Sequence, residues 1–258
     1  MIENKTIFPH FLSLVPIKIE LMFNNVSLAL GTAFIYRKNN KLYLVSAWHN
    51  FSGINPETKQ PLSAHGGLPN KVKCRLILNE ELISWSDEMF DLTKNDYEKL
   101  WMEHPTHKEK VDIGVLPISV NKKFKVNAIN DYKFSDMRTE IAQDVFILGF
   151  PRGIPGRREL PIWKRGSIAS EPGGNYPKIL IDSATREGMS GSPVIMRYKG
   201  FYFKEPGKIN NDDWMGEGDL FLGVYSGRLG KEEIKAQLGV VWKSYIIDEI
   251  INQAEELN

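Results

Sequence analysis

The sequence predicts an all-β fold, a barrel or a sandwich, and three features of its 258 residues support this prediction. Short runs rich in branched and aromatic residues recur along the chain, as in β-strands. Turn-forming residues separate these runs, and few stretches between them have helical periodicity. Parallel α/β folds need a helix between successive strands, so the spacing favours antiparallel sheets.

Nine runs are expected to form strands at the short intervals typical of barrels and sandwiches. In chain order they are SLALGTAFIYR (27–37), KLYLVSAW (41–48), VKCRLIL (72–78), DIGVLPIS (112–119), DVFILGF (144–150), KRGSIAS (164–170), KILIDS (178–183), SPVIMRYK (192–199) and LFLGVYSGR (220–228). Two polar segments interrupt this order. We interpret residues 79–110 as an insertion between two strands, and residues 200–220 as a solvated hairpin.

Two segments carry helical signals. Residues 95–104, NDYEKLWMEH, are expected to form a helix inside the insertion. The C-terminal segment KSYIIDEIINQAEEL has apolar residues on one face at helical spacing, namely Ile246, Ile247, Ile250, Ile251 and Ala254. We expect this stripe to pack on the core, and a helix that binds a partner is the alternative.

Composition excludes several classes of protein. The formal net charge is +1 and no basic stripe is present, so we expect no nucleic-acid partner. Cys74 is the only cysteine, which excludes an internal disulfide and a cysteine-based zinc site. No signal peptide and no run of about 18 apolar residues is visible, so we expect no membrane contact and a cytoplasmic location.

The stretch SATREGMSGSPVIM, residues 183–196, has two interpretations. It is either an ordinary polar turn between strands or a tight loop that presents a nucleophilic serine, Ser190. A serine hydroxyl is a poor nucleophile without a base, and His49 is the best candidate because it follows the buried run LYLVSAW. Asp112 is the best candidate to orient His49, because a charge that adjoins a buried strand needs a partner.

The order His49, Asp112, Ser190 is that of the chymotrypsin-type arrangement. The motifs GTAFIY, LVSAWHN, VDIGVLPI, VFILGFPRG, KRGSIAS, GMSGSPV and LGVYSGR occur in the sequence order of trypsin-like serine peptidases. The chain resembles this family from about Leu28 to its C-terminus, and it is most similar to the disulfide-free bacterial members.

The resemblance implies a fold of two packed six-stranded antiparallel β-barrels of the chymotrypsin type with a C-terminal α-helix. We expect a single peptidase domain over residues 1–258. Its N-terminal barrel would cover about residues 20–125, its C-terminal barrel about 135–232, and its helix 238–257. The active site would lie in the cleft between the barrels.

The resemblance also assigns the site residues. His49, Asp112 and Ser190 would form the catalytic triad, and the backbone N–H groups of Gly188 and Ser190 would form the oxyanion hole. Walls of the substrate pocket would come from Ala184, Thr185, Tyr225, Ser226 and Gly227. Ala184 would stand at the base of this pocket, where no carboxylate is present, so we expect a small or medium apolar residue before the scissile bond rather than Lys or Arg. An acidic residue, favoured by Arg186 and Arg228, is the alternative.

One position departs from the pattern of many family members. Where they carry an aspartate that pairs with a new N-terminus after activation cleavage, this chain has Met189. We therefore expect no activation of that kind.

The expected function is a serine endopeptidase without metal or cofactor, acting on an intracellular protein or peptide substrate. The alternatives are a silent binding or scaffold module and an esterase with the same triad. Regulation would come from the insertions, a partner protein or assembly.

Overall fold

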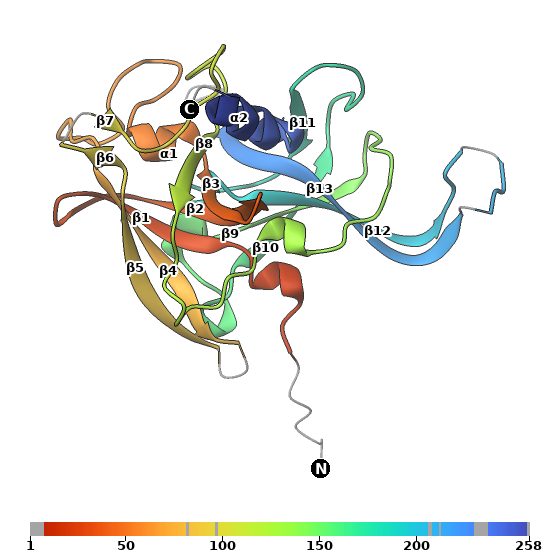
Figure 1. Cartoon of the computed structure of the whole chain (residues 1–258). Helices are drawn as coiled ribbons and strands as arrows, with labels where there is room; N and C mark the ends of the chain where they lie inside the picture. Colours follow the sequence, from red (N-terminus) through yellow and green to blue (C-terminus); the bar gives the residue numbers. More distant parts are fainter. Residues whose placement is uncertain are drawn as a thin grey trace.

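The computed structural model describes residues 8–80, 83–95, 98–205, 208–211, 213–229 and 237–256. The first six-stranded antiparallel sheet has the strand order β5-β4-β1-β2-β3-β8 (Figure 1). Its strands are β1 (Ile17–Phe23), β2 (Val26–Lys38), β3 (Lys41–Ser46), β4 (Lys71–Asn79), β5 (Ser84–Asp91) and β8 (Gly114–Ile118). A small two-stranded sheet joins β6 (Thr93–Lys94) to β7 (Glu98–Lys99).

The second sheet is a closed antiparallel barrel with the order β10-β11-β14-β13-β12-β9. Its strands are β9 (Asp144–Gly149), β10 (Ile162–Ile168), β11 (Lys178–Asp182), β12 (Pro193–Tyr202), β13 (Trp214–Arg228) and β14 (Leu238–Lys243). Strands β12 and β13 stay paired out to Tyr202 and Trp214, and they project from the body as a long hairpin (Figure 1). The hairpin expected from residues 200–220 is thus present.

Short helical turns connect the strands. They are η1 (Phe11–Ser13), α1 (Trp48–Ser52), η2 (Ile129–Asp131), η3 (Pro151–Gly153) and η4 (Arg157–Glu159), and the chain ends in α2 (Tyr245–Glu256). No helix in the described part of the chain is long and apolar enough to span a bilayer.

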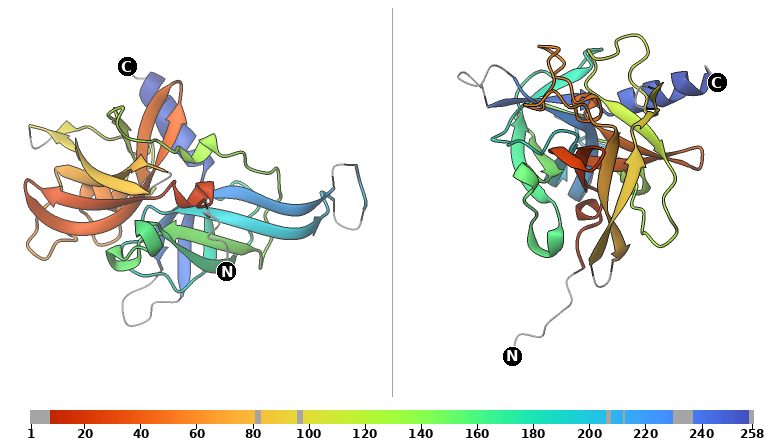
Figure 2. Two further views of the ribbon diagram at one scale, coloured as in Figure 1. Left: turned by 90° about the horizontal axis from the view of Figure 1, so that it is seen from below. Right: turned by 90° about the vertical axis from the view of Figure 1, so that its left-hand side faces the viewer.

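Three apolar clusters form the core of the protein. One fills the N-terminal sheet, another fills the C-terminal barrel, and the third lies between them. The apolar face of α2 belongs to this third cluster, with Ile246, Ile247, Ile250 and Ile251 at most 1% exposed. The cluster also takes residues from strands of both sheets, so α2 packs over the junction of the two lobes seen in Figure 2. The expected role of the apolar stripe is confirmed.

All nine predicted strands are present, and all belong to the two large sheets. The expected chymotrypsin-type fold, with two packed units of six antiparallel strands and a C-terminal helix, is therefore confirmed. Both units were expected to be barrels, and the second one closes into a barrel while the first is a six-stranded sheet.

The interpretation of residues 79–110 as an insertion is wrong in part. Residues Ser84–Asp91 form β5, which pairs with β4 along its whole length. The helix expected at 95–104 is also wrong where the chain is described, because this segment is extended: Met102 exchanges backbone hydrogen bonds of 2.7 and 2.9 Å with Val115. Tertiary pairing with β8 overrides the local helical preference there.

The boundary of the C-terminal helix also needs correction. The helix begins at Tyr245, whereas residues 238–243 form β14 between β11 and β13. This strand closes the C-terminal barrel, which therefore extends beyond residue 232. The run LGVVWK has the branched and aromatic residues of a strand, and its pairing on both sides leaves no unpaired edge.

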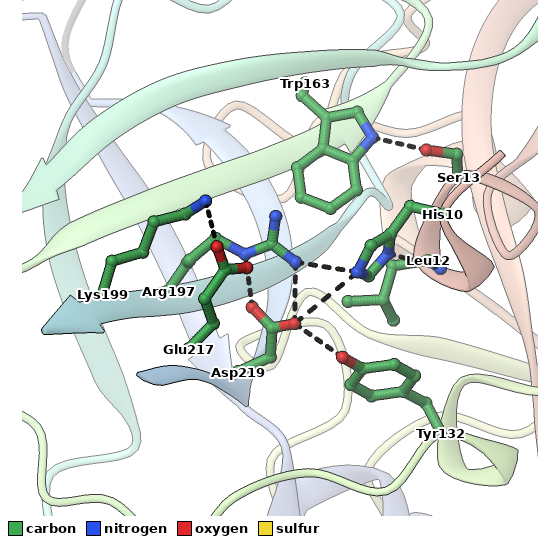
Figure 3. Close-up of polar contacts among 9 residues, drawn as sticks. All are labelled: His10, Leu12, Ser13, Tyr132, Trp163, Arg197, Lys199, Glu217 and Asp219. Carbon is green, nitrogen blue, oxygen red and sulfur yellow. Dashed lines mark hydrogen bonds and ion pairs between the residues drawn. The ribbon is translucent and has the colours of Figure 1, made fainter. Parts of the chain in front are cut away.

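An ion-pair cluster attaches the N-terminal segment to the C-terminal barrel (Figure 3). Arg197 and Asp219 form two hydrogen bonds of 2.7 and 2.8 Å, and both side chains are largely buried. The Tyr132 hydroxyl donates to the same carboxylate at 2.7 Å. His10, which precedes η1, contacts Arg197 at 3.0 Å through Nε2. These contacts fix η1 against the β12–β13 hairpin.

Candidate active site

The element that carries His49 is the short helix α1, which follows β3 directly. Gly53 caps the C-terminal end of α1, and its N–H donates to the His49 carbonyl at 3.0 Å. Trp48 and Phe51 of α1 pack on Trp101, with ring centroids 6.1 and 5.8 Å apart. The buried neighbours fix the helix, and the His49 side chain stays 16% exposed. The segment that was expected to be a helix thus supports His49 through Trp101.

Asp112 lies against His49 and is 4% exposed. Its Oδ2 atom is 2.8 Å from His49 Nδ1, and its Oδ1 atom accepts the His49 backbone N–H at 2.9 Å. The Ser226 hydroxyl also donates to Oδ2. An ionised carboxylate accepts only, so the bond at Nδ1 places the proton of the neutral ring there and leaves Nε2 as an acceptor.

The charges of this pair support each other. Burial alone would lower the pKa of His49, but the charge of Asp112 and its hydrogen bond outweigh burial and raise that pKa above its ordinary value. Burial alone would likewise raise the pKa of Asp112. The charge of His49 and the hydrogen bonds from His49 and Ser226 outweigh it and lower that pKa. Asp112 is therefore a carboxylate at neutral pH.

Gly188 and Ser190 lie on the tight loop between β11 and β12. Gly188 has φ +86°, and a Cβ atom there would lie 2.5 Å from the Phe150 carbonyl oxygen, so only glycine fits. Within the described residues, the backbone N–H groups of Gly188 and Ser190 donate to no acceptor. Two unpaired N–H groups on one loop are suited to bind an oxyanion.

The main chain of Ser190 is hydrogen-bonded to α1, the helix that carries His49. Its carbonyl accepts a bond of 3.0 Å from Nδ2 of Asn50, the residue after His49. The Ser190 hydroxyl itself has no hydrogen-bond partner in the part of the chain that the structure describes. Catalytic hydrogen bonds are often long in the absence of substrate and shorten when it binds.

The expected pocket residues divide into two groups. Thr185 and Tyr225 are only 1% and 2% exposed, and their hydroxyls are hydrogen-bonded to each other. Ser226, the next residue, lies at a break in the register of β13, and its hydroxyl donates to Asp112. Ala184 and Gly227 are partly exposed. No space open to water therefore reaches the Thr185–Tyr225 pair.

Three residues that the sequence analysis did not single out also contact this site. Thr32 donates its N–H to the Ser190 carbonyl at 3.0 Å, and Asn50 donates to Ser46 Oγ at 2.9 Å as well as to Ser190. Thr32 and Ser46 are fully buried. Their motifs, GTAFIY and LVSAWHN, were visible in the sequence, but the role of these side chains depends on how the two sheets meet.

Metal ligands are not grouped anywhere in the described residues. The rings of His104 and His107 are in contact at a tilt of 35°, with their centroids 4.9 Å apart. His104 Nδ1 accepts the backbone N–H groups of Thr106 and His107, so it stabilises a turn.

The site combines a buried His49–Asp112 pair with a glycine-rich serine loop that is hydrogen-bonded to the helix of this histidine, and these are the parts from which serine hydrolases build a triad. A family model described as the trypsin-like peptidase domain matches residues 31–200, about two thirds of the chain. The chain belongs to this family of trypsin-like peptidases, and it is a serine endopeptidase by that membership. Its substrate is accordingly a protein or peptide.

Solved structures of similar fold come from bacterial proteases. An inactive serine-to-alanine mutant of Rv3671c from M. tuberculosis H37Rv has a TM-score of 0.50 at 14% identity, over 95% of this chain and 88% of that one. The active form of the Rv3671c protease has a TM-score of 0.49 at 15% identity, over 93% and 80%. The serine endoprotease from Yersinia pestis has a TM-score of 0.49 at 12% identity, over 93% and 62%. No curated protein matches the sequence.

Proposed function

We propose that the chain cleaves peptide bonds through a triad of His49, Asp112 and Ser190. His49 Nε2 takes the proton of Ser190 as the hydroxyl attacks the scissile carbonyl, and Asp112 stabilises the cation that forms. The protonated His49 then gives its proton to the leaving amine. Water hydrolyses the acyl-enzyme by the same steps. The observation that carries this proposal is the buried His49–Asp112 bond of 2.8 Å, which makes Nε2 the acceptor.

The unpaired N–H groups of Gly188 and Ser190 would form the oxyanion hole. Each fixed donor of this type contributes about 3 to 4 kcal/mol to transition-state stabilisation.

The proposed substrate carries a small apolar residue before the scissile bond. The family resemblance assigns the pocket base to Ala184 and two of its walls to Thr185 and Tyr225, whose buried side chains are hydrogen-bonded to each other and leave little room between them. Ala184 adds no negative charge that would attract Lys or Arg.

We also place the substrate inside the cell, because the only cysteine, Cys74, is free and buried and the chain is built without disulfides. A partner protein is proposed as a regulator.

Activation by a new N-terminus is not part of this proposal. Met189 is fully buried in the apolar cluster of the C-terminal barrel. A methionine there supports the loop by packing and forms no ion pair with an amine.

Reaction with a fluorophosphonate probe tests the triad. The wild-type protein should be labelled at Ser190, and Ser190→Ala should abolish labelling. Ser183→Ala is the matched control, because the Ser183 hydroxyl is buried without a partner in the described structure, and this variant should label normally. A wild type that stays unlabelled under conditions where it is folded would contradict the proposal.

Substrate profiling separates peptidase from esterase activity and tests the pocket. We expect cleavage of library peptides that carry Ala or another small apolar residue before the scissile bond, and hydrolysis of matched esters. Cleavage of esters alone would favour the esterase alternative. A profile dominated by Lys or Arg would contradict the proposed pocket.

A further inference from the structure

Thr32 lies on β2 of the N-terminal sheet, yet its side chain contacts the serine loop of the C-terminal barrel. Its Oγ1 atom donates to the Gly188 carbonyl at 2.8 Å and accepts the Phe150 N–H at 3.2 Å. A hydroxyl has one proton to donate, so the Phe150 contact leaves that proton for Gly188. The residue is 0% exposed, and water cannot replace these bonds.

The backbone of Thr32 holds the same loop at a second point. Its N–H donates to the Ser190 carbonyl at 3.0 Å, and its own carbonyl accepts from Ser46 Oγ at 2.7 Å. Gly191, the next residue of the loop, permits this approach: a Cβ atom there would lie 2.1 Å from the Thr32 carbonyl oxygen. Thr32 therefore contacts the carbonyls of both residues whose N–H groups would bind the oxyanion.

These contacts bear on the direction of the oxyanion donors. In a trans peptide the N–H points opposite to the preceding C=O, so a bond to that carbonyl fixes the N–H. The Glu187 carbonyl accepts the Arg152 N–H at 2.6 Å, and the Met189 carbonyl accepts the Ser192 N–H at 3.0 Å. These two bonds orient the N–H groups of Gly188 and Ser190. Between them lies the Gly188 carbonyl, and Thr32 Oγ1 is its donor.

Without that donor, the peptide between Gly188 and Met189 would keep only the bond of 3.3 Å from the Met189 N–H to the Arg186 carbonyl. Glycine has low barriers to rotation of its flanking peptides, and a buried carbonyl that lacks a partner costs about 1 to 3 kcal/mol. Rotation of the peptide after Gly188 would relieve this cost and would turn the neighbouring donors away from the substrate.

We propose that Thr32 is a positioning residue for the oxyanion hole, and that its hydroxyl holds the Gly188 peptide in the orientation that catalysis requires. This inference rests on the proposed function of the same site. Removal of a whole oxyanion donor lowers kcat about 100- to 1,000-fold in serine proteases. Partial loss of orientation should give a smaller effect, about 10- to 100-fold.

The test compares Thr32→Val with wild type, using a peptide substrate chosen from the library and a peptide boronate that forms a tetrahedral adduct. Valine keeps the shape and the backbone N–H but lacks the hydroxyl. We expect kcat to fall about 10- to 100-fold, KM to change less than about threefold, and boronate affinity to fall in parallel with kcat. Thr32→Ser should restore both to within about threefold of wild type.

Two comparisons separate positioning from general loss of structure. Thr93→Val removes a buried hydroxyl that, unlike that of Thr32, has no hydrogen-bond partner in the described structure. This variant should leave kcat unchanged. Thr32→Ser and Thr32→Ala differ by the hydroxyl alone, so their difference in kcat stays informative even if Thr32→Val fails to fold.

The outcomes are distinct. If the wild type is active, three results would each overturn the inference and leave the triad intact. They are an unchanged kcat in folded Thr32→Val, an equal kcat for Thr32→Ser and Thr32→Ala, and a boronate affinity that does not follow kcat. A folded wild type that is inert towards the fluorophosphonate would instead contradict the proposed function itself.

Discussion

Replacement of Asp112 by Asn gives the most direct test of the His49–Asp112 pair. Asn is nearly the same size as Asp, so the packing around this buried residue should survive. The variant loses the negative charge that stabilises protonated His49. It also offers an amide in place of one carboxylate oxygen, which disturbs the hydrogen bonds now made at 2.8 and 2.9 Å.

The magnitude follows from the distance. Opposite charges about 4 Å apart attract by about 4 kcal/mol at an effective dielectric constant of about 20. Since each ~1.4 kcal/mol is a factor of ten in rate, loss of this attraction in the transition state should slow the reaction about a thousandfold. The tautomer that Asn favours, with the proton on Nε2, adds to this, and the total effect should reach about 10³- to 10⁴-fold.

The pH profile gives a second readout. Labelling needs neutral His49, so the wild-type rate should rise with pH through the raised pKa of His49, above the ordinary histidine value of about 6.5. In Asp112→Asn the charge that raises this pKa is gone while burial, which lowers it, remains. The acid limb should therefore move to lower pH.

The assay is the second-order rate of fluorophosphonate labelling between about pH 5 and 9, with circular dichroism to show that each variant is folded. Asp91→Asn serves as the control, because Asp91 is an exposed aspartate on β5, and its profile should match wild type. A folded Asp112→Asn protein that labels within tenfold of wild type, or whose acid limb moves to higher pH, would refute this account of the pair.

Three further predictions concern other parts of the chain. Gly188→Ala should reduce labelling at least about 100-fold, because its Cβ would collide with the Phe150 carbonyl and displace an oxyanion donor; normal labelling would contradict the assigned loop geometry. Tyr225→Leu should raise cleavage after Leu relative to Ala about tenfold in a peptide library, because space opens beside Thr185; an unchanged profile would place the pocket elsewhere. Asp219→Ala should lower the free energy of unfolding, measured in urea, by about 3 kcal/mol or more, because Arg197 is only 15% exposed and would lose its carboxylate partner. A loss below about 1 kcal/mol would show that water replaces the pair.

The fold could be predicted from the sequence where strands are marked by their own residues. Each of the nine expected strands has a run of branched and aromatic side chains between turn residues, and these runs pack on the apolar clusters. Strand β5 was missed because its sequence, SWSDEMFD, is polar on one side and pairs only at an edge of the sheet. Edge strands take their conformation from the neighbouring strand, so the local sequence says little about them.

The candidate site could also be predicted from the sequence only in part. His49, Asp112 and Ser190 could be proposed because the chemistry needs those side chains and their order along the chain is distinctive. The support of the oxyanion loop is different, since it runs mainly through backbone groups: the four successive carbonyls from Glu187 to Ser190 all accept hydrogen bonds, three of them from segments outside the loop. Any residue can supply a backbone N–H, so no sequence pattern marks these contacts. Two side chains also take part, the hydroxyl of Thr32 and the amide of Asn50, and they acquire that role only where the two sheets bring them against the loop.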